Sequence, residues 1–103
     1  MKYVYPCVFI PEEVGGFSVI FPDIAGATQG ENLYEALYMA EDALGLMLSS
    51  AEDDGEEIPT PTPIEKIKTD GNSFVTLIKI DTDSYRKVLA EEKSSAPTEK
   101  ISA

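Results

Sequence analysis

The sequence predicts an α+β domain in which one long helix packs on an antiparallel sheet. Three observations predict this class: short alternating apolar segments joined by tight turns at the start, one long helical apolar stripe in the middle, and another alternating segment after it. The chain has 103 residues, of which 43% are hydrophobic, and this is typical of one globular domain. We expect that domain over residues 1–92 and a flexible polar tail over residues 93–103.

Three short strands are expected at the beginning of the chain. Residues 2–10 alternate and are rich in β-branched and aromatic side chains, and residues 17–21 repeat this pattern after a Gly-Gly turn. The short connection predicts a β-hairpin. A second turn over residues 22–26 leads to a third strand over residues 27–29, so all three strands are expected to be antiparallel.

One long helix is expected from about residue 32 to about residue 50. Asn32 suits the N-cap position, and Glu35 stands three residues later, as in a capping box. A continuous apolar stripe follows, and it consists of Leu33, Ala36, Leu37, Ala40, Leu44, Met47 and Leu48. This stripe predicts the face that packs on the sheet.

The remaining chain is expected to return to the sheet. Three prolines within residues 58–63 favour an extended crossing segment, because each disfavours a helix before it. Residues 73–80 alternate as a strand, and a short helix through Tyr85, Val88 and Leu89 is expected after them. The predicted order is strand, strand, strand, helix, strand and short helix, with one sheet face left uncovered.

Negative charge is concentrated in the first part of the chain. The net charge is −11, and residues 1–62 carry twelve acidic side chains and one basic one, Lys2, whereas residues 63–103 carry seven of each. Such a surface repels nucleic acid, because phosphate binding depends on Lys and Arg. It favours fast association with a basic protein. The alternative is that the charge only keeps the domain soluble.

Few groups are available for chemistry. The chain has one cysteine and no histidine, which excludes an intrachain disulfide and metal sites built from His and Cys. Cys7 lies mid-strand between apolar neighbours and is expected to be a small core residue. The carboxylates with enough spacing for a metal-dependent nuclease site are Asp23, Glu41 and Asp81, but nothing in the spacing forces them together. We therefore expect no cofactor, no metal and no enzymatic activity.

The N-terminal segment does not have the features of a targeting signal. It lacks the long apolar region and the small-residue cleavage site of a signal peptide, and no apolar run is long enough to cross a membrane. We therefore expect a cytoplasmic protein without membrane contact.

The side of the helix opposite the stripe is a candidate interface. Tyr34 and Tyr38 are four residues apart and share this face, which Glu41, Asp42 and Gly45 continue. Tyrosine is enriched in protein interfaces. The alternative is that both tyrosines cover the rim of the core. Glycine within a helix lowers stability by about 1 kcal/mol relative to alanine. Close approach of another backbone would explain why glycine is present at position 45.

Several short motifs occur in a characteristic order: YPCVF, the hairpin GGFSVIFPD, the turn from Pro22 to Gly26, TQG, and a helix that opens with EAL. In this order they resemble the N-terminal domain of HicB-type antitoxins. IPTPTP and FVTLIKID are also similar, so the resemblance covers about residues 3–83. It implies a partial ribonuclease H fold without the catalytic carboxylates, and a binding function. The implied partner is a HicA-like toxin, a small basic mRNA-cleaving ribonuclease whose active site the antitoxin covers.

The residues and the resemblance together predict a partner-binding surface. It combines acids at the sheet edge and the helix start with two tyrosine anchors: Glu12, Glu13, Asp23, Glu31, Glu35, Tyr34 and Tyr38. Three residues match the family motif and are expected to be structural, namely Pro22, Gly26 and Gly30. A homodimer or higher homo-oligomer is also expected.

The sequence departs from the family in its C-terminal part. HicB proteins usually continue into a ribbon-helix-helix or helix-turn-helix domain, whereas 22 residues follow Asp81 here. Nucleic-acid binding is therefore not expected from this chain alone. The alternative function is an orphan acidic protein-interaction or ligand-binding module without a toxin, which the absence of a neighbouring gene for a small basic protein would favour.

Overall fold

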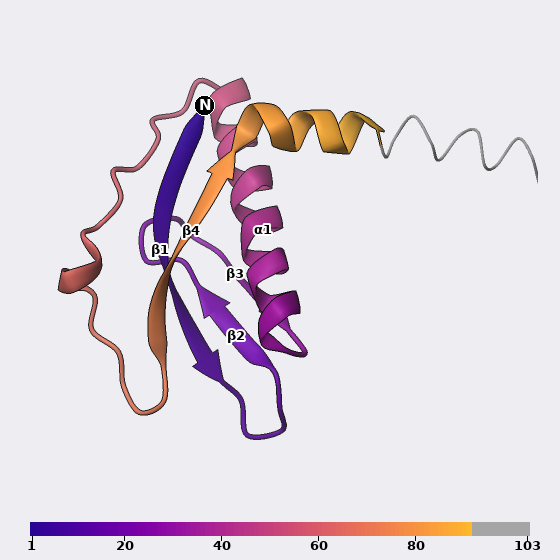
Figure 1. Cartoon of the computed structure of the whole chain (residues 1–103). Helices are drawn as coiled ribbons and strands as arrows, with labels where there is room; N and C mark the ends of the chain where they lie inside the picture. Colours follow the sequence, from indigo (N-terminus) through magenta and orange to yellow (C-terminus); the bar gives the residue numbers. More distant parts are fainter. Residues whose placement is uncertain (92–103) are drawn as a thin grey trace, which may run out of the picture.

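The structure is a computed structural model that describes residues 1–91, so the expected tail over residues 93–103 lies outside the described residues. The elements are β1 (Lys2–Pro11), β2 (Phe17–Ile20), β3 (Ala27–Gly30), α1 (Leu33–Asp53), the short 3₁₀-helix η1 (Ile64–Lys66) and β4 (Phe74–Asp81), and residues 82–91 are helical (Figure 1). The predicted α+β class and the predicted order of strands and helices are confirmed. Helix α1 extends about one turn further than expected, to Asp53.

The four strands form one antiparallel sheet in the order β3-β2-β1-β4. The central strand β1 pairs with β4 from Lys2 opposite Asp81 to Phe9 opposite Phe74. The first three strands pair in sequence order, as their tight turns predict. Because β4 joins the far side of β1, the chain between α1 and β4 has to cross the domain, and the proline segment makes this crossing.

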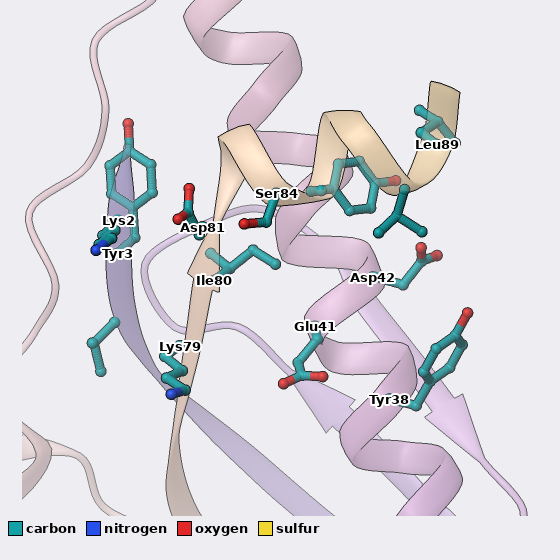
Figure 2. Close-up of a pocket in the computed structure, with 13 residues that line it drawn as sticks. Lys2, Tyr3, Tyr38, Glu41, Asp42, Lys79, Ile80, Asp81, Ser84 and Leu89 are labelled. Atoms are coloured by element: carbon teal, nitrogen blue, oxygen red, sulfur yellow. The ribbon is translucent and has the colours of Figure 1, made fainter. Parts of the chain in front are cut away.

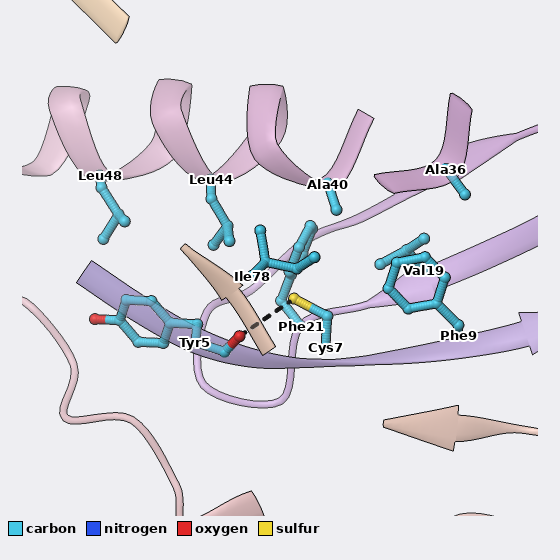
Figure 3. Close-up of a cluster of buried hydrophobic side chains, with 10 residues drawn as sticks. All are labelled: Tyr5, Cys7, Phe9, Val19, Phe21, Ala36, Ala40, Leu44, Leu48 and Ile78. Carbon is cyan, nitrogen blue, oxygen red and sulfur yellow. Dashed lines mark hydrogen bonds between the residues drawn. The ribbon is translucent and has the colours of Figure 1, made fainter. Parts of the chain in front are cut away.

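The core lies between α1 and one face of the sheet (Figure 3). Tyr5, Cys7 and Phe9 of β1 are buried toward the helix. Successive side chains of a strand point to opposite faces of the sheet, so every second residue faces the helix. The facing side chains of α1 come from the predicted stripe, and those that are fully buried are Ala36, Ala40, Leu44 and Leu48. The small side chain of Ala36 suits a close approach of α1 to β3, where the backbone of Ala36 lies against Gly30.

Leu33 is the exception to the predicted stripe, because its side chain is 44% exposed. It is the first residue of α1, and side chains of a helix lean toward its N-terminus. Its side chain therefore lies beyond the edge of the core.

Within residues 1–91, no helix is long and apolar enough to cross a membrane.

Cys7 is fully buried, which confirms its expected place in the core. Burial raises the pKa of its thiol to about 12, and the negative charge of Asp23 acts in the same direction. The thiol therefore stays protonated at pH 8, and the thiolate is the reactive form. We expect a disulfide reagent to modify the folded chain at least about a hundredfold more slowly than the chain unfolded in guanidinium. Rapid modification of the folded chain would contradict this burial.

Candidate partner-binding surface

Four of the predicted contact acids lie on two segments that meet near the start of α1. Glu12 and Glu13 lie at the β1–β2 turn, Glu31 and Glu35 lie at the start of α1, and all four are exposed. The turn and the helix start are in contact, since a Cβ placed on Gly16 would lie 2.7 Å from the Gly30 carbonyl oxygen and 3.3 Å from the Cα of Glu31. We call these four acids the acidic end of the domain.

The start of α1 has the capping arrangement that the sequence predicts. The backbone N–H of Glu35 donates to the Asn32 side chain over 2.8 Å, and the Glu35 carboxylate accepts from the backbone N–H of Glu31 over 2.9 Å. These bonds satisfy donors that a helix otherwise leaves unpaired. Glu35 therefore stabilises the helix start, whereas Glu31 contributes its backbone and leaves its carboxylate exposed.

The two tyrosines continue the acidic end along α1. The side chain of Tyr34 is 85% exposed and that of Tyr38 is 57% exposed. The alternative that both cover the rim of the core is therefore wrong for Tyr34. Large exposed aromatic side chains beside carboxylates give an interface both contact area and charge.

Asp23 lies apart from the acidic end. Its carboxylate accepts the backbone N–H of Thr62 over 2.9 Å and also the Thr62 hydroxyl. It lines a hollow with residues 46–48 and 50–51 of α1. Those residues belong to the last turns of a 21-residue helix that is about 30 Å long, whereas the acidic end lies at its first turn. Asp23 therefore holds the proline segment on the domain, together with the hydroxyl of Tyr5, which donates to the Pro59 carbonyl.

The structure does not bring together all three carboxylates proposed for a nuclease site. Glu41 in α1 and Asp81 at the end of β4 line the same groove, whereas Asp23 precedes β3 and lines a separate hollow. Among residues 1–91, no group of three or more acidic, histidine or cysteine side chains is placed to hold a metal ion.

The motif glycines lie against α1. A Cβ on Gly26 would lie 3.0 Å from the sulfur of Met47, and a Cβ on Gly30 would lie 2.4 Å from the backbone nitrogen of Ala36. Pro22 is exposed and opens the bend that leads to Gly26. The turn and the TQG motif thus bring β3 close to the helix.

The sequence does not predict the polar junction that surrounds Glu52. The Glu52 carboxylate accepts from the hydroxyls of Tyr3 and Thr82, and it lies 3.2 Å from the Arg86 guanidinium. Arg86 also donates to the Ser49 carbonyl over 2.8 Å. The hydrogen bond from Tyr3 lowers the pKa of Glu52 and, reciprocally, raises the pKa of Tyr3 to about 12. The junction joins β1, the end of α1 and the helix over residues 82–91.

A second contact fixes the same helix on α1. A Cβ on Gly45 would lie 2.5 Å from the ring of Tyr85. An aromatic ring, and not another backbone, therefore makes the close approach that explains Gly45. The prediction of a backbone neighbour at this position is wrong. Glycine is required here because any larger side chain would displace the ring.

Comparison with known proteins gives one consistent result. Residues 5–97 match the model of a family described as HicB-like antitoxins of bacterial toxin–antitoxin systems. The chain is 43% identical over 86 residues to antitoxin HicB of Escherichia coli K12, a match that covers 82% of this chain and 57% of that protein. It is 48% identical over 61 residues to antitoxin HicB 1 of Photorhabdus laumondii, a match that covers 58% of this chain and 39% of that protein.

The fold is also similar to that of chains in two solved toxin–antitoxin complexes. One complex is from Streptococcus pneumoniae, with a TM-score of 0.75 at 22% identity and coverage of 99% of this chain and 98% of that chain. The other is the HicA3 and HicB3 complex, with a TM-score of 0.62 at 23% identity and coverage of 77% of this chain and 99% of that chain. The chain spans about half the length of the curated relatives, because the matches cover 57% of the Escherichia coli protein and 39% of the Photorhabdus laumondii protein.

Proposed function

This chain belongs to the family of HicB-like antitoxins of bacterial toxin–antitoxin systems, and from this membership we propose that it neutralises a small basic HicA-like ribonuclease. The proposed mechanism is masking, in which the domain occupies the RNA-binding face of the toxin. The family suggests a non-catalytic role. We place the pair in the cytoplasm.

The observation that supports this proposal most directly is the acidic end with its neighbouring tyrosines. Glu12, Glu13 and Glu31 are exposed and belong to two segments that contact each other, and Tyr34 and Tyr38 follow Glu31 along α1. A toxin that binds RNA needs basic side chains, and these would find complementary charge at this end. Long-range attraction would speed encounter, while the tyrosines would supply the buried contacts that slow dissociation.

We propose that the domain forms a homodimer or a higher homo-oligomer. Operator binding is not part of the proposed function of this chain, because the acidic surface does not favour contact with phosphates.

Reversing charge at the acidic end tests the proposal. In the double variant Glu13→Lys/Glu31→Lys, two exposed carboxylates become ammonium groups. We expect the Kd for the small basic protein encoded beside this gene to rise about tenfold or more, mainly through slower association. Binding is measured by surface plasmon resonance at two salt concentrations, and inhibition of RNA cleavage by the same protein is measured in parallel.

The matched control is Glu56→Lys/Glu57→Lys, which makes the same change of net charge in the exposed segment after α1. Its affinity is expected to stay within about threefold of wild type. Equal loss in both variants would mean that only net charge matters. A wild-type chain that neither binds the neighbouring protein nor blocks its RNA cleavage would overturn the antitoxin proposal and favour an orphan module.

A further inference from the structure

A groove of about 690 Å³ lies between α1, the end of β4 and the helix over residues 82–91 (Figure 2). Its apolar lining comes from all three elements, with Tyr38 on α1, Ile80 on β4 and Val88 and Leu89 on the last helix. The side chain of Val88 is 52% exposed. An exposed apolar hollow of this size is typical of a binding site rather than of a bare surface.

The groove exists because the last helix is fixed across α1. Tyr85 rests on Gly45, and Arg86 is bound to Glu52 and to the Ser49 carbonyl. These contacts hold the helix in one direction, so the apolar side chains that line the groove are presented by a defined scaffold. Such preorganisation lowers the cost of binding.

Three carboxylates and two lysines line the groove. Glu41 and Asp42 lie on the wall formed by α1, whereas Lys2, Lys79 and Asp81 lie at the end formed by β1 and β4. In Figure 2, Glu41 projects from α1 on the side of β4, and Asp42 lies near Tyr38. Basic groups of a partner are therefore favoured along the α1 wall.

The groove is continuous with the proposed binding surface. Tyr38 lines the groove and stands one helical turn after Tyr34, which in turn stands beside the acidic end. The acidic end, the tyrosines and the groove thus form one band along the exposed side of α1.

We propose that this groove seats an amphipathic basic segment of the toxin, with an apolar side chain against Val88 and Leu89 and Lys or Arg against Glu41 and Asp42. This rests on the proposed antitoxin function and extends its contact surface to the middle of α1 and to the helix over residues 82–91. A second copy of this chain fits this groove less well, because an acidic chain would meet the acidic α1 wall, so we place the contact of the proposed homo-oligomer on another surface.

The test compares Val88→Lys with Ala90→Lys. Both residues are exposed and lie on the same helix, but Val88 lines the groove and Ala90 does not. Lysine at position 88 removes apolar contact area and repels a basic segment. We expect Val88→Lys to raise the Kd for the basic protein encoded beside the gene at least about tenfold, with Ala90→Lys close to wild type. Circular dichroism melts confirm that both variants fold.

A second measurement uses the wild-type chain and needs no variant. Hydrogen exchange is recorded with and without the basic protein, and slower exchange is expected at residues 84–89 in the complex. Equal affinity of the two lysine variants, or unchanged exchange at residues 84–89, would overturn the groove assignment. The antitoxin proposal would still hold in that case if the wild-type chain binds the basic protein. No binding by wild type would overturn both. If Val88→Lys instead converts an oligomer to a monomer at unchanged toxin affinity, the occupant is a second copy and the assignment is wrong.

Discussion

Replacing Gly30 with alanine is expected to lower the free energy of unfolding by about 3 kcal/mol. The added Cβ would lie 2.4 Å from the nitrogen and 2.6 Å from the Cα of Ala36, and 2.8 Å from the carbonyl carbon of Glu35. These are backbone atoms in the first turn of α1, so no side chain can rotate away to make room. Either β3 or the helix start has to move, and Gly30 and Ala36 are both buried. Urea denaturation measures the change.

The neighbouring variant Gln29→Ala is the control for Gly30→Ala. Gln29 lies on the same strand and is exposed, so its truncation is expected to change stability by less than about 0.5 kcal/mol. A Gly30→Ala chain as stable as wild type would contradict the close packing of β3 on α1. It would also mean that the glycine of the TQG motif has a role other than packing.

Replacing Glu52 with alanine is expected to cost about 3 kcal/mol at pH 7. The change leaves the hydroxyl of Tyr3 without its acceptor. The fully buried Thr82 hydroxyl loses the closer of its two acceptors and keeps the Met1 carbonyl at 3.3 Å. Arg86 also loses the better shielded of its two carboxylate partners, since the side chain of Glu52 is 17% exposed and that of Asp53 is 72% exposed. We expect the helix over residues 82–91 to detach first, which circular dichroism would record as lost helix.

Asp53→Ala is the matched control for Glu52→Ala. It removes a carboxylate that also binds Arg86, over 2.9 Å, but this carboxylate is exposed to solvent. Exposed ion pairs contribute about 0–1 kcal/mol, so the expected loss is small. Equal losses in the two variants would show that the junction is no stronger than an ordinary surface ion pair.

The stability contributed by this junction is expected to depend on pH in two directions. The pKa of Glu52 is lowered in the folded chain, first by the Tyr3 hydrogen bond, so its contribution is present above the ordinary carboxyl range and is lost as pH falls through the lowered value. The pKa of Tyr3 is raised to about 12, so its contribution is complete below about pH 10 and is lost as pH rises toward 12. The free energy of unfolding is measured as a function of pH. Glu52→Gln is expected to flatten the acid side of this profile, and Tyr3→Phe is expected to flatten the alkaline side.

Much of the fold could be predicted from local patterns. Alternation identified the strands, the apolar stripe identified the buried face of α1, and Asn32 with Glu35 identified the helix start. These features depend on neighbours within one turn or one hairpin, so the sequence contains the full signal for them. The same periodicity predicts the side of α1 opposite the stripe, and Tyr34 and Tyr38 are exposed there in the structure.

Residue type and short spacing are enough to predict the element order, the buried stripe, the buried thiol and the uneven charge. Which distant side chains meet depends on how the whole chain folds. Asp23 binds a residue 39 positions away, and Tyr3 binds Glu52 across 49 positions. No periodicity connects such pairs, since they meet only after the crossing segment and the last helix have packed. For the same reason, only the folded chain separates Asp23 from the acidic end and forms the groove beside Tyr38.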